Sequence, residues 1–254
     1  MQFFEIYGFP GSGKTSFLDS LHKNKKINKK LKNYEELFYN HLYQNSKLSI
    51  SKIKFIFKRK LNKTDDIRFF LYNNYNNDQF KEKIDKNFNQ FRANNRKLCE
   101  IFFELLKLSI HSKARKQRIK FYFKINAASF NLLKKLKKNN FFYYNDEGFK
   151  QKIFLNYKAQ NKKKILKLLK EYLNLCPKTN NNLCIKKSFK ECVKIAKSRK
   201  ANFEYINDNL KSLESIYAFI LDNISKINKK ILIIEKYSNE NKNIQKFKKK
   251  ILSI

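Results

Sequence analysis

The hydrophobic and polar positions of the chain follow first a strand period and then a helix period. Residues 2–7 form an alternating, aromatic-rich run that is typical of a β-strand. After a glycine-rich turn, Phe17, Leu18 and Leu21 fall on one face of a helix. From about residue 33 to 128, apolar residues recur at helical spacing, and neither glycine nor proline interrupts them. We therefore expect a strand, a loop and a helix, followed by a long helical region.

The second half of the chain alternates short apolar runs with amphipathic segments. The apolar runs at 141–144, 183–185 and 231–235 read as buried strands. Amphipathic helices are expected at 162–175, 188–199, 207–229 and 239–254. Residues 53–57 fit a strand or a helix equally well, and residues 23–32 are expected to form a surface connection. Strands that alternate with helices predict an α/β fold, a parallel sheet wrapped by helices.

The loop after the first strand carries the clearest chemical signal. Residues 8–15 read Gly-Phe-Pro-Gly-Ser-Gly-Lys-Thr, a complete G-x-x-x-x-G-K-[ST] phosphate-binding motif (Walker A), and hold three of the chain's four glycines. The backbone N–H groups of such a loop and the dipole of the next helix favour a bound phosphate. The candidate nucleotide-binding residues are Gly8, Phe9, Pro10, Gly11, Ser12, Gly13, Lys14, Thr15 and Ser16. In this motif Lys14 reaches the β- and γ-phosphates, and the Thr15 hydroxyl coordinates Mg²⁺.

An acidic pair follows the aromatic run at 141–144. Asp146 and Glu147 stand at the predicted carboxyl end of a buried parallel strand, the end at which open α/β sheets bind ligands. We interpret this segment as a Walker B strand. Asp146 would hold Mg²⁺ through its water shell, and Glu147 would orient or deprotonate the attacking group. The alternative is a plain boundary between a strand and a turn.

The large net charge of the chain adds less to the functional interpretation than its magnitude suggests. The formal net charge of +37 would normally indicate a nucleic-acid partner or an anionic membrane surface. Only seven of the 58 basic residues are arginine, however, and lysine is spread along the whole chain. We therefore interpret most of the lysines as solvent-facing residues, with a polyanion-binding surface as the alternative.

The cysteines and histidines of the chain indicate the cellular compartment. The four cysteines and three histidines show neither a C-x-x-C pair nor a zinc-binding spacing, so we expect reduced thiols in an intracellular core. The first predicted strand starts at residue 2, which leaves no room for a signal peptide, and no apolar run approaches the ~18 residues that span a bilayer. We expect a cytoplasmic protein with a single domain over residues 1–254. The oligomeric state stays open, with a homodimer as one option.

With both motifs placed, the order of elements resembles the P-loop kinases of the nucleoside-monophosphate-kinase type, and thymidylate-kinase-like proteins most of all. The likeness covers residues 1–22 and about 139–254. It implies a P-loop NTPase fold in which the helical stretch 33–128 is inserted between the Walker A and Walker B elements as the acceptor-binding part. It also implies a lid helix whose arginine contacts the donor's phosphates, and Arg199 falls at that place.

Two features depart from that family. Lids of the family often carry R-x-x-x-R, whereas Ile195 stands four residues before Arg199. Thymidylate kinase has Asp-Arg where this chain has Asp146, Glu147 and Gly148, with Gln151 soon after. This acidic motif looks more like that of uncharacterised P-loop kinase-like proteins, which are often associated with bacterial surface-polysaccharide gene sets.

The motifs and the resemblance together imply an ATP- and Mg²⁺-dependent kinase that transfers a γ-phosphoryl group to a small nucleotide- or sugar-like acceptor. The expected catalytic residues are Lys14, Asp146, Glu147 and Arg199, and the expected metal ligands are Thr15 and Asp146. The alternative is a P-loop ATPase that couples hydrolysis to a nucleic acid or protein partner, although nucleic acid is the less favoured partner. A GTPase is disfavoured because the chain has no D-x-x-G in the expected place. The acceptor and the preference for ATP over GTP stay open.

Four further arginines stand out in a chain that mostly uses lysine. Arg92 and Arg96 are four residues apart, and Arg115 and Arg118 are three apart, so each pair shares a helix face. They could make bidentate contacts to an anionic acceptor. A solvated basic face or a set of salt bridges is the alternative.

Overall fold

The structure is a computed structural model of the chain. It describes residues 2–9, 11–44, 68, 71–76, 78–136, 141–145, 147–155, 157, 159–178, 181–198, 210–227, 231–234 and 242–253. The run at 53–57, which the sequence left undecided between strand and helix, lies outside these residues.

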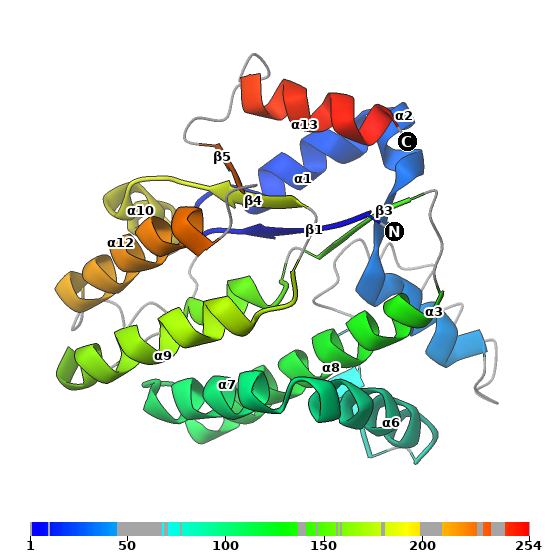
Figure 1. Cartoon of the computed structure of the whole chain (residues 1–254), viewed down its shortest axis with the longest axis horizontal. Helices are drawn as coiled ribbons and strands as arrows, with labels where there is room; N and C mark the ends of the chain where they lie inside the picture. The colour runs from blue at the N-terminus through cyan, green and yellow to red at the C-terminus, as the bar shows by residue number, and fades with distance from the viewer. Residues whose placement is uncertain are drawn as a thin grey trace. The chain divides into compact units, whose positions relative to one another are not determined.

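A five-stranded sheet has the order β2-β3-β1-β4-β5 (Figure 1). The strands are β1 Gln2–Tyr7, β2 Leu31–Asn33, β3 Phe142–Asn145, β4 Asn181–Ile185 and β5 Ile231–Ile234. β1 pairs in parallel with β3 and β4, and β4 pairs in parallel with β5. The register places Glu5 beside Asn145 and Tyr7 beside Cys184. The predicted α/β class, a parallel sheet wrapped by helices, is confirmed.

The helices follow the predicted amphipathic segments closely. They are α1 Lys14–Lys23, α2 Lys25–Lys30, α3 Tyr34–Gln44, α6 Asp78–Asn94, α7 Arg96–Leu108, α8 Lys113–Leu136, α9 Lys162–Leu175, α10 Phe189–Ser198, α12 Leu210–Ile227 and α13 Lys242–Leu252, with 3₁₀ turns η1 Lys150–Ile153 and η2 Ala159–Asn161. Ser188 caps α10 through a reciprocal pair of hydrogen bonds with Glu191, at 2.5 and 3.3 Å. Within the described parts of the chain, no helix is long and apolar enough to cross a bilayer.

The prediction of a surface connection over residues 23–32 is wrong. This stretch forms α2 and β2. The side chain of Asn24 caps α2 by accepting hydrogen bonds from the N–H groups of Lys26 and Ile27 at 3.1 and 3.2 Å. Ile27 and Leu31 are buried in the core, and α2 contacts α13. The lysine-rich composition concealed two apolar residues four positions apart, whose burial fixes the segment.

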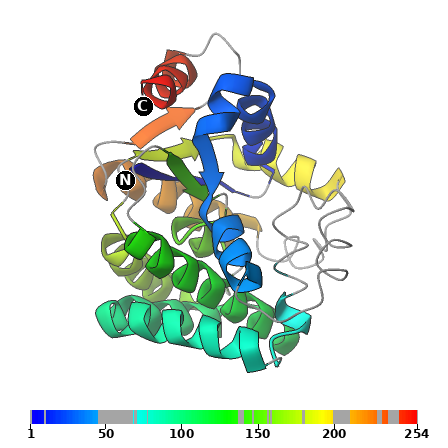
Figure 2. The ribbon, with the colours of Figure 1, turned by 90° about the vertical axis from the view of Figure 1, so that its right-hand side faces the viewer.

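One face of the sheet is apolar and is covered by α1, α2 and α13, as Figures 1 and 2 show. Phe4 and Ile6 of β1 point to this side, and the ring of Phe4 meets that of Phe247 edge-on with centroids 4.9 Å apart. The core of this face consists of Phe4, Ile6, Phe17, Leu18, Leu21, Ile27, Leu31, Phe142, Tyr144, Leu183, Ile185, Ile234, Ile244, Phe247 and Ile251.

The opposite face of the same strands buries polar groups. They include Glu5, Tyr7, Asn145 and Cys184. The side chain of Glu5 accepts a hydrogen bond from the N–H group of Phe149 at 2.9 Å, so the segment around η1 covers this face. α9 also lies on this side of the sheet in Figure 1. Because buried polar groups are costly unless they are paired, each of these side chains requires a partner on this face.

The chain forms two compact units. Unit 1 is Met1–Lys32, Lys97–Ser112 and Lys138–Ile254, and unit 2 is Asn33–Arg96 and Lys113–Lys137. The predicted helical stretch 33–128 is therefore divided, since Lys97–Ser112, with most of α7, belongs to unit 1. In unit 2, α8 packs on α3 and α6, and a fully buried ion pair joins Arg68 to Glu35 at 2.6 Å.

Candidate functional site

The phosphate loop, residues 8–15, connects the central strand β1 to α1. Gly11 and Gly13 have φ angles of 88° and 100°, a left-handed conformation that glycine adopts at little steric cost. Gly13 is the N-cap of α1 and makes no side-chain capping hydrogen bond. The first four N–H groups of a helix have no partner within it, so the start of α1 offers backbone donors and the positive end of its dipole.

Two side chains of the loop suit an anionic ligand. Lys14 Nζ donates a hydrogen bond to Gly8 O at 2.9 Å, so the ammonium group lies against the loop's own backbone. Ser12 is 5% exposed, and its Oγ has no hydrogen-bond partner among the described residues. An unpaired buried hydroxyl costs about 1–3 kcal/mol, and a phosphate oxygen would give it a partner. Thr15 and Ser16 are exposed in the first turn of α1.

Phe9 anchors the loop to the helices beside it. The side chain is 4% exposed, and its ring centroid lies 5.3 Å from that of Phe189 and 5.1 Å from that of Tyr217. A Cβ atom at Gly11 would lie 2.4 Å from Cys192 O, so the backbone of α10 packs directly on the loop. The conformation of the loop therefore depends on α10 and α12.

The acidic segment leaves β3 in a tight turn. Asn145 is buried at the end of β3, and its Oδ1 accepts a hydrogen bond from the N–H group of Glu147 at 2.7 Å, which closes an Asx turn. The Glu147 carboxylate is partly exposed and accepts a hydrogen bond from Lys152 Nζ at 3.0 Å. Sequence analysis missed Lys152, because one lysine among so many carries no signal of its own.

Three predicted site residues, Pro10, Asp146 and Arg199, lie outside the described residues. Where residues are described, the chain holds no group of three or more His, Cys, Asp or Glu side chains that could bind a metal ion. Of the two expected Mg²⁺ ligands, Thr15 is thus the one that the structure places, at the start of α1.

The loop and the acidic segment lie at one edge of the sheet. β1 leads to α1 on the apolar face, whereas its neighbour β3 leads to η1 on the opposite face. In open α/β sheets, ligands bind at the carboxyl ends of two neighbouring strands whose connections leave to opposite faces. A hydrogen bond from the N–H group of Gly8 to Gln151 Oε1, 3.1 Å long, joins the two segments across this edge. Sequence analysis had noted Gln151 without giving it a role.

The four highlighted arginines are exposed. Arg92, Arg96, Arg115 and Arg118 all belong to unit 2. The guanidinium carbon of Arg118 lies 5.8 Å from the centroid of the Tyr72 ring. In the same unit, Arg68 is buried against Glu35, a pair that no local sequence pattern predicts.

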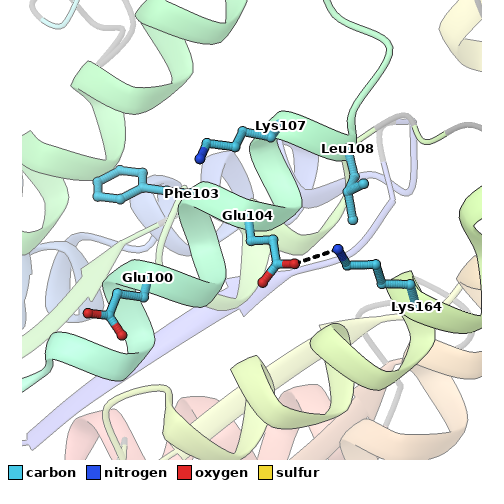
Figure 3. A pocket seen from close by; sticks show the side chains of 6 residues that line it. All are labelled: Glu100, Phe103, Glu104, Lys107, Leu108 and Lys164. Carbon is cyan, nitrogen blue, oxygen red and sulfur yellow. Dashed lines mark ion pairs between the residues drawn. The ribbon is translucent and has the colours of Figure 1, made fainter.

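A pocket of about 540 Å³ lies between α7 and α9, within unit 1 (Figure 3). It is lined by Glu100, Phe103, Glu104, Lys107, Leu108 and Lys164. Glu104 and Lys164 face each other and form an ion pair at 2.7 Å. The lining contains no residue of the loop at 8–15, and its two carboxylates balance its two ammonium groups, so the pocket has no net charge to attract an anion.

Burial keeps the thiols and phenols of the polar face uncharged at neutral pH. It raises the pKa of Cys184 to about 12 and the pKa of Cys176 further. Burial also raises the pKa of Tyr7 well above its ordinary value, helped by Cys184 and Glu5 nearby. All four cysteines are buried free thiols, as the sequence predicted. A thiol that stays protonated is a poor nucleophile, so burial disfavours thiolate chemistry at Cys184 and Cys176.

The site thus consists of a loop shaped for an anion and a neighbouring acidic turn, held together by η1. The loop contributes Lys14, Ser12 and the N-terminus of α1. The acidic turn contributes Glu147 and its partner Lys152. Compared with known protein families and with curated proteins, the chain matches no family model and no curated sequence.

Proposed function

We propose that the chain is an ATP-dependent phosphotransferase that uses a P-loop to transfer the γ-phosphoryl group of Mg-ATP to a small nucleotide- or sugar-like acceptor. The observation that carries this proposal is the phosphate loop itself. It combines the complete motif at residues 8–15, a left-handed Gly13 at the start of α1, and an unpaired Ser12 hydroxyl. Together these features supply the donors that bind a polyphosphate.

Each residue has a role in this proposal. Lys14 would leave Gly8 O and bind the β- and γ-phosphates, while Thr15 and Asp146 hold Mg²⁺. Glu147 would orient the acceptor hydroxyl and take its proton. The bond between the γ-phosphorus and its bridging oxygen breaks, a bond to the acceptor oxygen forms, and ADP leaves. Arg199 would offset the charge of the transition state.

We propose a single P-loop kinase-like domain in the cytoplasm, where Mg-ATP is available and thiols stay reduced. The helical stretch 33–128 would be the acceptor-binding part, and its arginines would contact the anionic groups of the acceptor. A homodimer is consistent with the proposal but is not required by it.

The test is ADP production from Mg-ATP by the purified chain. We would measure it alone, with pooled nucleoside monophosphates and sugars, and with single- or double-stranded DNA, beside a Lys14→Ala variant. Stimulation by the metabolite pool that disappears in the variant is the expected result. No ADP production under any condition by a folded chain would contradict the proposal.

A second candidate is a P-loop ATPase that acts on a nucleic acid or protein partner. The observation that favours it is the sequence of α8, which carries eight basic and no acidic residues between Lys113 and Leu136. Such a helix suits a polyanion. Stimulation by DNA alone in the same assay would favour this candidate over the kinase.

A further inference from the structure

η1 buries three consecutive polar side chains beside the candidate site. The exposed fractions of Lys150, Gln151 and Lys152 are 5%, 8% and 6%. Two ammonium groups and an amide are costly to bury unless each of them is paired. A four-residue 3₁₀ turn adds little stability of its own, so the partners of these side chains indicate what the turn does.

The two lysines fix η1 to the strands that lead to the site. Lys150 Nζ lies 3.6 Å from the carboxylate of Glu5 on β1, and that carboxylate also accepts hydrogen bonds from the N–H groups of Phe149 and Lys150 at 2.9 and 3.3 Å. Lys152 Nζ donates to Glu147 at 3.0 Å. The acidic turn and β1 are therefore connected through η1.

The chain's fourth glycine makes this arrangement possible. A Cβ atom at Gly148 would lie 2.5 Å from Glu5 Oε1 and 2.6 Å from its carboxyl carbon. Any larger residue would push the turn away from the buried carboxylate. Both glycine-containing motifs are thus shaped by close approach to a neighbouring group.

Gln151 extends the connection to the phosphate loop. Its Oε1 accepts a hydrogen bond from the N–H group of Gly8 at 3.1 Å, across a separation of 143 residues. The carbonyl of the same residue, Gly8, accepts the hydrogen bond from Lys14 at 2.9 Å. Gly8 is therefore the residue at which the loop lysine and η1 meet. A ligand that draws Lys14 away from Gly8 O therefore acts on Gly8, the same residue whose N–H group donates to Gln151 Oε1.

We propose that Gln151 is a positioning residue that couples the occupancy of the phosphate loop to the placement of Glu147. The route runs through hydrogen bonds from Lys14 to Gly8 and from Gly8 to Gln151. It then follows the chain from Gln151 to its neighbour Lys152, which donates to Glu147. The inference deepens the proposed function and rests on it, because it needs a nucleotide in the loop.

The four glycines offer a direct test. A chain labelled with ¹⁵N-glycine gives four amide signals, three from the loop and one from the acidic turn. Carbonyl labelling of the preceding residues, Tyr7, Pro10, Ser12 and Glu147, assigns each signal, because the four residue types differ. The ligand is a non-hydrolysable Mg-ATP analogue. In the unaltered chain, we expect it to shift the signals of Gly8, Gly11, Gly13 and Gly148.

The variants separate coupling from binding. Gln151→Met removes the acceptor oxygen at similar volume, and the exposed Gln160→Met is its matched control. In Gln151→Met we expect the signals of the loop glycines to respond to the analogue as before. The shift of the Gly148 signal should fall by at least half. Without the analogue, the Gly8 amide should exchange with solvent at least tenfold faster than in the unaltered chain. An unchanged Gly148 response and an unchanged Gly8 exchange rate would overturn the inference.

Two more comparisons keep the test decisive. If Gln151→Met does not fold, Gln151→Asn, which withdraws the oxygen, should uncouple Gly148, and Gln151→Glu, which keeps it, should not. Equal behaviour of these two variants would also overturn the inference. Failure of the proposed function gives a different result, in which no loop glycine responds in the unaltered chain or Lys14→Ala responds as that chain does.

Discussion

The two faces of the parallel sheet are built on different principles, although neighbouring residues of β1 supply both. Phe4 and Ile6 point into an apolar core under α1, α2 and α13. Glu5 and Tyr7 point to the other side, where η1 adds buried lysines. The apolar face stabilises the fold by burial, which tolerates changes of shape. The polar face depends on pairing, so one lost partner leaves a buried charge.

The largest expected effect compares two neighbours on β1. Glu5→Leu should lower the free energy of unfolding by about 3–5 kcal/mol, because it leaves the buried Lys150 ammonium and two N–H groups without their acceptor. Ile6→Leu, on the apolar face, conserves side-chain volume and should cost about 1.5 kcal/mol or less. Urea denaturation of both variants measures the difference. Equal losses would mean that the two faces are not built differently.

The next effect compares two glycines. Gly148→Ala places a methyl group 2.5 Å from Glu5 Oε1 and should cost about 1–3 kcal/mol through overpacking of the polar face. Gly13→Ala meets no atom within 4 Å, so its cost should be that of a left-handed backbone alone, about 1–2 kcal/mol. Nucleotide affinity separates them further, since only the Gly13 variant alters the phosphate loop. A Gly148 variant of unaltered stability would contradict the close approach of Glu5.

Raising the pH should lower the free energy of unfolding through a buried group of the polar face. The thiol of Cys184 keeps its proton up to a pKa of about 12 in the folded chain, whereas an unfolded thiol loses it near pH ~8.5. The unfolded state therefore binds fewer protons above that pH, so the free energy of unfolding should fall as the pH rises, by about 2 kcal/mol at pH 10. Cys184→Ser should reduce this slope in urea denaturation series from pH 7 to 10. An identical slope would show that the Cys184 thiol is not protected by burial.

The smallest effect concerns Tyr7. Its hydroxyl is buried and has no hydrogen-bond partner among the described residues. Tyr7→Phe removes an unsatisfied polar group at nearly constant volume, so it should leave stability unchanged or raise it by about 1 kcal/mol. Thermal unfolding of the variant measures this change. A marked destabilisation would indicate that the hydroxyl has a partner.

Local signals predicted much of this architecture. The alternation at residues 2–7 and the amphipathic pattern at 162–175 gave β1 and α9, because side-chain period depends on local backbone geometry. The phosphate motif likewise located Gly13 at the start of α1. α2 and β2 were not predicted, because their few apolar residues stand among lysines.

The polar network behind the site could not be predicted in the same way. The bond between Gly8 and Gln151 joins residues 143 positions apart, and no local pattern carries that information. Lys150 and Lys152 look like every other lysine of a lysine-rich chain, although both are buried. A usable signal did exist in Glu5, since an acidic residue inside a buried strand requires a partner.

The most direct test of the central claim is the binding of Mg-ATP measured by isothermal titration calorimetry, for the unaltered chain and for Lys14→Ala. The account predicts one site per chain and a loss of about 10–100-fold in affinity in the variant, because a charge-assisted bond to phosphate is removed. Thermal unfolding should confirm that both chains are folded. A folded chain that binds no Mg-ATP, or that binds it equally well without the Lys14 ammonium group, would contradict the account.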